Sequence, residues 1–215
     1  MIKTIIFDFD NTIYFNSVID TYPSYLRTAL KTIFKTEEEI DAFYKRNNFS
    51  PDPGNENIIR ALEREGRKFN KFYRYIKNNV YMHDKKANNV LPNEFFEELS
   101  KKYSVYCVSL SGQKYLKVHF KEYGIKKKYF KAIVSTDLLR QEKSKTIDYI
   151  YIQQKENVAF DQMLMVGDNY ANDIEPAEKL GMKALHFKQK SFDQLYDYFI
   201  DNKILDCTRF KSGKK

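Results

Sequence analysis

Asp8 and Asp10 are separated by a single residue at the end of an apolar run, in the segment IIFDFDNTI. In an extended strand, alternate side chains leave the backbone on the same face, so both carboxylates point in the same general direction. Two like charges this close are tolerated when a cation lies between them or one carboxylate holds a proton. Mg²⁺ suits such a pair because it binds one or two carboxylates and keeps room for water and phosphate. The pair predicts a phosphoryl-transfer site; two solvated aspartates at an exposed strand end are the alternative from this segment alone.

A second pair of acids follows another apolar run, in the segment MLMVGDNYANDI. Gly167 permits a tight exit from a strand. Asp168 and Asp173, five residues apart, can bracket a metal ion from a short loop and the start of a helix. These acids predict further ligands for the same cation.

Residues with hydroxyl groups follow the apolar run 105–108, where Val108 is succeeded by Ser109, Leu110, Ser111 and Gly112. A small hydroxyl and free backbone amides at the start of a helix can hold a phosphate oxygen. Two lysines, Lys143 and Lys145, come after a fourth apolar run and before the next helical stretch.

A lysine in that position could neutralise a phosphate and a phosphorylated aspartate together. Tyr14 and Phe15 directly follow the segment of the first acid pair. They either line the entrance to the site or pack at a hinge.

Five short, continuous apolar runs predict the strands that position these residues, at 4–7, 105–108, 132–134, 163–166 and 183–187. The later runs alternate with stretches whose apolar residues recur every three or four positions, which indicates helices. This alternation predicts an α/β fold, a doubly wound parallel sheet. Ligands bind such sheets beyond the carboxyl ends of the strands, where the polar residues above are found.

Residues 15–89 lack a convincing strand and predict an inserted all-helical domain, with a turn cluster at 51–55 and a second break at Gly66. The stretch from Arg67 to about Tyr81 predicts an amphipathic helix with a basic stripe of Arg67, Lys71 and Arg74. We expect a solvated charged face there. The core is then predicted at 1–14 and 90–205, with a mobile C-terminal tail at 206–215.

The composition is that of a globular chain: 215 residues, 42% hydrophobic, with a net charge of +8. No stretch approaches the roughly 20 apolar residues that cross a bilayer, and the N-terminus lacks the pattern of a signal peptide, so we expect a cytoplasmic protein without a membrane partner. Cys107 and Cys207 show no metal-binding spacing, and we expect reduced thiols. The positive charge fits either nucleic acid or anionic substrates.

Taken in order, these motifs resemble the haloacid dehalogenase-like hydrolase superfamily. The resemblance rests on DFDNT, a serine after the second core strand, a lysine ahead of a helix, and GDNYAND. It covers the predicted core, and the inserted helices fit the superfamily's helical cap domain. It implies a Rossmann-like core and Mg²⁺ as cofactor.

The resemblance also implies roles for individual residues. Asp8 is the nucleophile that forms an aspartyl-phosphate, and Asp10 is the general acid and base. The expected phosphoryl-binding residues are Asn11, Thr12, Ser109, Leu110 and Lys143. The resemblance implies a characteristic sequence separation between the hydroxyl residue and the turn glycine, here Gly124, and this separation selects Ser109 over Ser111. Lys143 matches a Lys-Pro pair in which Ser144 replaces proline, and Lys145 is held in reserve. The expected magnesium ligands are Asp8, the main-chain carbonyl of Asp10, Asp168 and Asp173.

The implied activity is hydrolysis of a small phosphorylated metabolite. Asp10 argues against a dehalogenase, since displacement of a halide needs no proton delivered to a leaving alcohol. The segment DNTIY is similar to phosphatases of pyrimidine nucleoside monophosphates, which suggests a nucleotide substrate. Two alternatives stay open: a sugar-phosphate mutase of the same fold, and a non-catalytic protein that binds anions or nucleic acid. The complete acid set argues against the second, so we do not expect a nucleic-acid partner.

Overall fold

The computed structural model describes residues 1–15, 22–49, 54–78, 89–135, 145–188 and 191–211. The chain divides into two compact units, one made of Met1–Ser17 and Lys86–Lys215 and the other of Val18–Lys85.

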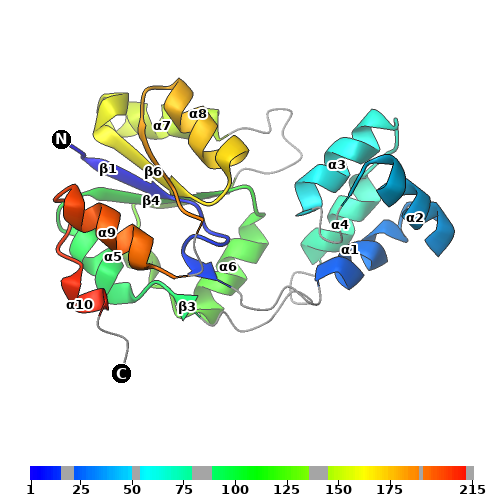
Figure 1. The fold of residues 1–215 in the computed structure, drawn as a ribbon, viewed down its shortest axis with the longest axis horizontal. Coiled ribbons are helices and arrows are strands. Elements are labelled where there is room, and N and C mark those ends of the chain that lie inside the picture. The colour runs from blue at the N-terminus through cyan, green and yellow to red at the C-terminus, as the bar shows by residue number, and fades with distance from the viewer. Residues whose placement is uncertain (16–21, 50–53, 79–88, 136–144, 189–190, 212–215) are drawn as a thin grey trace. The chain divides into compact units, whose positions relative to one another are not determined.

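The first unit is built on a five-stranded sheet in the order β5-β4-β1-β6-β7, in which all neighbouring strands are parallel (Figure 1). The strands are β1 (Thr4–Phe7), β4 (Ser104–Ser109), β5 (Ala132–Ser135), β6 (Met163–Gly167) and β7 (Lys183–His186). Each coincides with a predicted apolar run to within two residues at either end. The predicted α/β fold with a doubly wound parallel sheet is confirmed.

Helices cover both faces of this sheet. Side chains of β1 alternate between the faces: Ile5 and Phe7 pack into one hydrophobic cluster and Ile6 into the other. The first cluster contains residues of α5 (Asn93–Ser100), α6 (Gln113–Glu122) and α9 (Asp193–Asp201), and the second contains residues of α7 (Thr146–Glu156) and α8 (Glu175–Lys179). Buried strands with two apolar faces explain the continuous apolar runs in the sequence.

Short elements complete the first unit. A two-residue strand β2 (Tyr14–Phe15) pairs antiparallel with β3 (Asn89–Val90). Two 3₁₀ turns, η2 (Lys127–Tyr129) and η3 (Phe160–Gln162), precede β5 and β6, and a π-helical turn, η4 (Tyr170–Ile174), leads into α8.

The prediction of a mobile tail from residue 206 is wrong for residues 206–211. Cys207 is fully buried, and α10 (Thr208–Lys211) follows it. The Phe210 ring lies 5.8 Å from the Phe95 ring and 5.7 Å from the Tyr196 ring, centroid to centroid. Burial of one aromatic side chain and a thiol against the core outweighs the polar composition of the surrounding residues.

The second unit consists, among its described residues, of α1 (Tyr22–Leu30), α2 (Glu37–Arg46), α3 (Gly54–Arg64) and α4 (Asn70–Asn78). Thr36 begins α2 with a capping box, in which its side chain accepts from the Glu39 amide and the Glu39 carboxylate accepts from the Thr36 amide. Gly66 adopts φ +68° between α3 and α4, a conformation that glycine reaches without strain. The turn cluster predicted at 51–55 falls largely outside the described residues.

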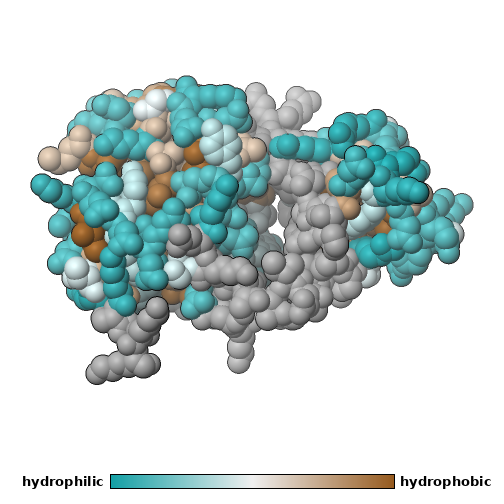
Figure 2. Space-filling model, in the orientation of Figure 1, coloured by the Kyte–Doolittle hydropathy of each residue, from teal (hydrophilic) through white to brown (hydrophobic). Residues whose placement is uncertain are grey.

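The predicted amphipathic helix is observed as α4, with Phe72 and Tyr73 buried and Lys71 and Arg74 exposed. Arg67 precedes the helix and stacks over the Phe34 ring at 4.5 Å. Hydrophilic residues cover most of the face of each unit that Figure 2 shows. Among the described residues, none of the helices combines the length and apolar character that crossing a membrane requires.

Candidate active site

The central strand β1 brings the predicted site residues together. It lies between β4 and β6, so the three strands end side by side at the carboxyl edge of the sheet. Asp8 directly follows β1, Ser109 is the last residue of β4, and Asp168 directly follows β6. The Asp8 amide donates to the Val166 carbonyl at 2.9 Å, which fixes the start of the loop against β6. The order of chain connection reverses at β1, and ligands bind at such a point in open α/β sheets.

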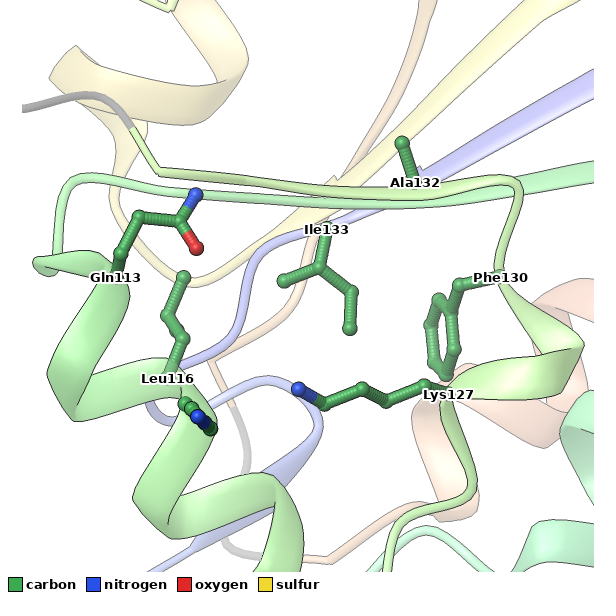
Figure 3. Close-up of a pocket in the computed structure, with 7 residues that line it drawn as sticks. Gln113, Leu116, Lys127, Phe130, Ala132 and Ile133 are labelled. Carbon is green, nitrogen blue, oxygen red and sulfur yellow. The ribbon is translucent and has the colours of Figure 1, made fainter.

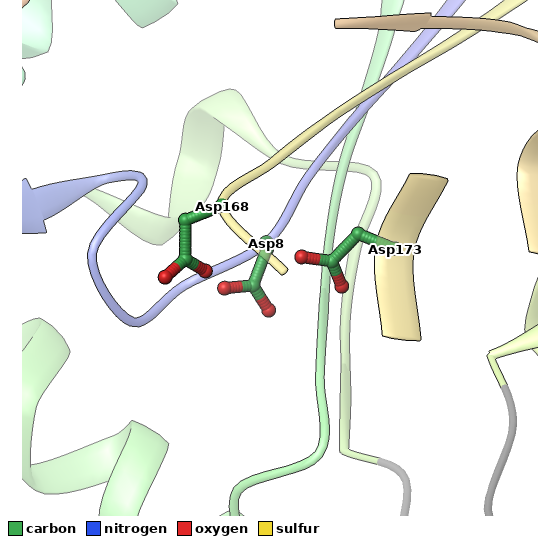
Figure 4. A group of neighbouring side chains, drawn as sticks. All are labelled: Asp8, Asp168 and Asp173. Atoms are coloured by element: carbon green, nitrogen blue, oxygen red, sulfur yellow. The ribbon is translucent and has the colours of Figure 1, made fainter. Parts of the chain in front are cut away.

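Three carboxylates form the candidate metal centre at this edge. One oxygen each from Asp8, Asp168 and Asp173 lie within 4.8 Å of one another, and Figure 4 shows the three side chains converging. Asp173 reaches the cluster from the π-helical turn η4, with only 1% of its surface exposed. A Cβ atom on Gly167 would lie 2.6 Å from the Asp173 Cγ atom, so a side chain at position 167 would displace this carboxylate.

Lys145 joins two of these acids. Its Nζ atom donates to the Asp8 Oδ1 atom and to the Asp173 Oδ1 atom, both at 2.5 Å, and its side chain is 1% exposed. Lys145 immediately precedes α7. The structure thus places the reserve lysine of the sequence interpretation in the site. Lys143, the preferred one, lies outside the described residues.

The charges of the cluster do not balance, because one ammonium faces three carboxylates. Burial raises the pKa of Asp8 well above its usual value; Lys145 opposes the rise, and Asp173 and Asp168 add to it. Burial and then Asp173 raise the pKa of Asp168 to about 6, against a hydrogen bond from the Asn11 side chain that lowers it. Burial alone would lower the pKa of Lys145, but Asp173 and Asp8 outweigh it and keep the ammonium charged.

A hard divalent cation fits this donor set. All three groups offer carboxylate oxygens, which Mg²⁺ prefers, and a cation would relieve the repulsion that raises the pKa of Asp8 and Asp168. The Asp10 side chain is outside this group of acids. A ligand role for its main-chain carbonyl stays a prediction.

The Asp10 carboxylate lies among hydroxyl groups. Its Oδ1 atom accepts from the Tyr14 hydroxyl at 2.5 Å and from the Tyr115 hydroxyl at 2.9 Å. Its Oδ2 atom accepts from Ser111 Oγ at 2.8 Å and, more weakly, from Ser109 Oγ at 3.5 Å. Two carboxylates two residues apart therefore have different partners: charged groups surround Asp8, and neutral hydroxyls surround Asp10.

The remaining predicted phosphate contacts lie around these acids. Asn11 adopts φ +55°, which Asn tolerates better than most residues, and hydrogen-bonds to Asp168. Thr12 is fully buried, and its Oγ1 atom has no hydrogen-bond partner among the described residues. Leu110 is half-buried in the turn after β4.

The two serines after β4 are linked, because the Ser111 amide donates to Ser109 Oγ at 3.0 Å. Both reach Asp10, and Ser111 makes the shorter contact. The choice between them as a phosphate contact stays a prediction.

Residues 5–187 match the family model described as haloacid dehalogenase-like hydrolase. The chain belongs to this hydrolase family. The resemblance seen in the motifs is confirmed. No curated protein matches this hydrolase.

Solved structures of the family share the fold of this hydrolase at low sequence identity. A predicted phosphoglycolate phosphatase from Haemophilus somnus 129PT is 22% identical over 85% of this chain and 84% of its own, with a TM-score of 0.55. A haloacid dehalogenase-like hydrolase from Xanthomonas campestris is 16% identical over 98% and 94%, with a TM-score of 0.57. A family enzyme from Bacteroides thetaiotaomicron, in complex with magnesium and inorganic phosphate, is 15% identical over 91% and 100%, with a TM-score of 0.55.

The sequence interpretation of this hydrolase did not find the hydroxyl of Tyr115. Tyr115 lies in a stretch whose apolar residues recur every three or four positions, which indicates a helix and does not single out its hydroxyl. A usable signal was its place in the first turn of the helix after Ser111, because that turn lies at the carboxyl edge of the sheet.

Figure 3 shows a separate pocket lined by Gln113, Leu116, Lys117, Lys127, Phe130, Ala132 and Ile133. Its lining includes none of the predicted site residues.

Proposed function

We propose that this hydrolase is a magnesium-dependent phosphatase of small phosphate monoesters, acting through an aspartyl-phosphate on Asp8. The different surroundings of Asp8 and Asp10 carry the proposal. A pair of carboxylates held in different environments is the usual way to divide nucleophile from general acid. Asp8 contacts an ammonium and faces two further acids, whereas the Asp10 side chain accepts hydrogen bonds from hydroxyls of the described residues.

In the first step an Asp8 carboxylate oxygen attacks phosphorus, and the bond from phosphorus to the leaving oxygen breaks. Asp10 gives its proton to that oxygen, so the product leaves as a neutral alcohol. In the second step Asp10 takes a proton from water, the water oxygen attacks phosphorus, and the bond to Asp8 breaks. Asp8 and Asp10 return to their starting states.

Asp8, Asp168 and Asp173 would hold Mg²⁺, with the Asp10 main-chain carbonyl as a further ligand. When bound, the ion supplies positive charge that offsets the repulsion between the carboxylate and the phosphate. Lys145 adds a fixed positive charge beside Asp8. Such fixed charge is the main contribution a protein makes to phosphoryl transfer, because charge spreads over the phosphoryl oxygens in the transition state.

The helical unit, Val18–Lys85, is proposed as the cap that selects the substrate. The segment DNTIY and the net charge of +8 support an anionic substrate, with nucleoside monophosphates as the first class to test.

The test is phosphate release from nucleoside monophosphates, sugar phosphates and an aryl phosphate, with and without Mg²⁺. We expect the parent protein to be active only with the metal and Asp8→Asn to lose at least about a thousandfold in kcat with its fold intact. Equal activity of Asp8→Asn and the parent would contradict the proposal. Transfer of phosphate within a sugar phosphate, without release, would indicate a mutase instead.

A further inference from the structure

Two tyrosine hydroxyls converge on one oxygen of Asp10 from separate parts of the chain. Tyr14 comes from β2, just after the Asp8 loop, and Tyr115 from the first turn of α6. Their hydroxyls lie 2.5 Å and 2.9 Å from Asp10 Oδ1 and 2.9 Å from each other. The three oxygens thus form a closed triangle of hydrogen-bond distances.

Both rings are held in place by packing. The Tyr14 ring lies 5.0 Å from the Phe9 ring and 4.6 Å from the Tyr123 ring, and the Tyr115 ring lies 4.0 Å from the His119 ring, centroid to centroid. Tyr14 is only 3% exposed. Packed rings leave their hydroxyls little freedom to move, so the position of Asp10 Oδ1 is fixed from the aromatic side.

Both hydroxyls are available as donors, because a phenol keeps its proton throughout the neutral range. On the other side of the carboxylate, Ser111 Oγ contacts Oδ2 at 2.8 Å. The orientation of Asp10 is thus set at both of its oxygens.

We propose that Tyr14 and Tyr115 are positioning residues for the proton transfers of Asp10, an inference that rests on the proposed phosphatase function. A hydroxyl both donates and accepts, so the pair can serve Asp10 before and after it gives up its proton by rotation of O–H bonds alone. A lysine or arginine in their place would only donate. General acid catalysis depends on a proton held at the right position, and the tyrosines act on that position rather than on phosphate.

The test compares Tyr14→Phe and Tyr115→Phe with two esters of similar shape, phenyl phosphate and p-nitrophenyl phosphate, with Mg²⁺ present. Phenolate is the poorer leaving group and needs the proton of Asp10 more. Because kcat/KM reports the steps up to cleavage of the ester, it isolates this proton transfer from the later attack by water. Tyr103→Phe is the matched control, because it removes a tyrosine hydroxyl that donates to the Ile204 carbonyl at 2.9 Å.

We expect each variant to lower kcat/KM for phenyl phosphate about tenfold and to change it for p-nitrophenyl phosphate by less than about twofold. Asp10→Asn should show the same selectivity more strongly, and Tyr103→Phe should treat both esters alike. Equal loss on both esters in Tyr14→Phe and Tyr115→Phe, or no loss on either, would overturn the proposal. A parent protein inactive on these two esters and also on nucleoside monophosphates and sugar phosphates would contradict the phosphatase function itself, and this inference with it.

Discussion

At the scale of single residues, the two aspartates after β1 have different kinds of partner: a charged group contacts Asp8, and neutral hydroxyls contact Asp10. Lys145 contacts Asp8 and Asp173, while the Asp10 side chain is held by tyrosine and serine hydroxyls. A nucleophile needs to stay ionised beside a developing negative charge, whereas a general acid needs partners that tolerate both of its protonation states. Lys145 favours the ionised form of Asp8, and a bound cation would add to it against the burial that raises the pKa of Asp8. The hydroxyls around Asp10 tolerate both of its protonation states.

The two candidate lysines can be separated by mutation. Lys145→Met removes the ammonium that lies 2.5 Å from both Asp8 and Asp173, and we expect kcat to fall at least about a hundredfold. Lys143→Met should retain kcat to within about threefold, since one fixed charge beside Asp8 suffices. Steady-state phosphate release checks this, with circular dichroism as the test of folding. Loss of activity in Lys143→Met with an active Lys145→Met would return the role to Lys143.

The raised pKa of Asp168 makes stability depend on pH in the absence of metal. The pKa of Asp168 is about 6 in the folded chain and near 4 in the unfolded chain. Between these pH values the folded chain therefore binds a proton that the unfolded chain has released. This contribution to stability is complete below about pH 4 and is lost as the pH rises through about 6.

Asp168→Asn removes that dependence. With a chelator present to remove metal ions, we expect the free energy of unfolding of Asp168→Asn to exceed that of the parent. The difference should grow with pH and reach at most roughly 3 kcal/mol above pH 6. Urea unfolding between about pH 5 and pH 7.5 measures the difference. Mg²⁺ should stabilise the parent more than the variant. A difference that shrinks as the pH rises would show that Asp168 is not held in its protonated form.

The acids of the site could be predicted from sequence because Asp8, Asp10 and Asp168 lie just after an apolar run and Asp173 follows in the same polar segment as Asp168. The lysine could not, since Lys143 and Lys145 both precede the helix, and the contacts of buried Lys145 with the acids are visible only in the structure. Tyr115 could not be predicted either, because the apolar spacing around it indicates only a helix. Its ring packs against His119, and only the position of its hydroxyl relates it to Asp10.

At the scale of elements, the exit from β6 positions two acids of the candidate metal centre. The strand ends in Gly167, and Asp173 packs directly against the position of its missing side chain. The π-helical turn η4 brings Asp173 to this place. Apolar periodicity predicts the strand but not the turn, because a π turn has no composition of its own.

Gly167→Ala should therefore weaken metal binding. The added methyl group would lie 2.6 Å from Asp173 Cγ and force that side chain away. We expect the Kd for Mg²⁺, measured by calorimetry, to rise about tenfold or more, in the range seen when groups that orient metal ligands are lost. Gly112→Ala is the control, because a methyl group there meets no atom within 4 Å. Equal Mg²⁺ affinities for the two variants would contradict this account of β6.

The C-terminal helix α10 is a second element that sequence did not predict, because four residues carry too little periodicity. Phe210 contacts Phe95 and Tyr196. Phe210→Ala should lower the free energy of unfolding by about 1–3 kcal/mol, less than for a fully buried ring. Phe210→Leu should cost clearly less, since it keeps most of the apolar contact. Chemical unfolding measures both, and unchanged stability of Phe210→Ala would mean that α10 does not pack on the core.

At the scale of the whole molecule, the interval without predicted strands, 15–89, overlaps the second compact unit, Val18–Lys85. Both hydrophobic clusters of the sheet are built from residues of the first unit alone. Strands β2 and β3 pair Phe15 with Asn89, so the chain leaves and re-enters the first unit at neighbouring positions. The first unit has the features of a domain that folds without the insertion.

Replacing residues 18–85 with a short Gly-Ser linker should therefore leave a folded first unit. We expect a cooperative unfolding transition that Mg²⁺ shifts to higher temperature, since the three carboxylates belong to the retained unit. Turnover of the ester that the full-length protein hydrolyses fastest should fall, and the differences in turnover among esters should become smaller. A shortened protein without a cooperative transition would show that the helical unit is needed for folding.

Trapping the covalent intermediate shows directly whether phosphate passes through Asp8. Parent protein and Asp10→Asn are mixed with Mg²⁺ and p-nitrophenyl phosphate, quenched in acid and reduced with borohydride, which converts a phosphorylated aspartate to homoserine. Peptide mass spectrometry then locates the modified residue. We expect homoserine at position 8 in both proteins. Its amount should be larger in Asp10→Asn than in the parent, because attack by water on the intermediate is slowed. Homoserine at another aspartate, or hydrolysis with an unmodified Asp8 in both proteins, would contradict the passage of phosphate through Asp8.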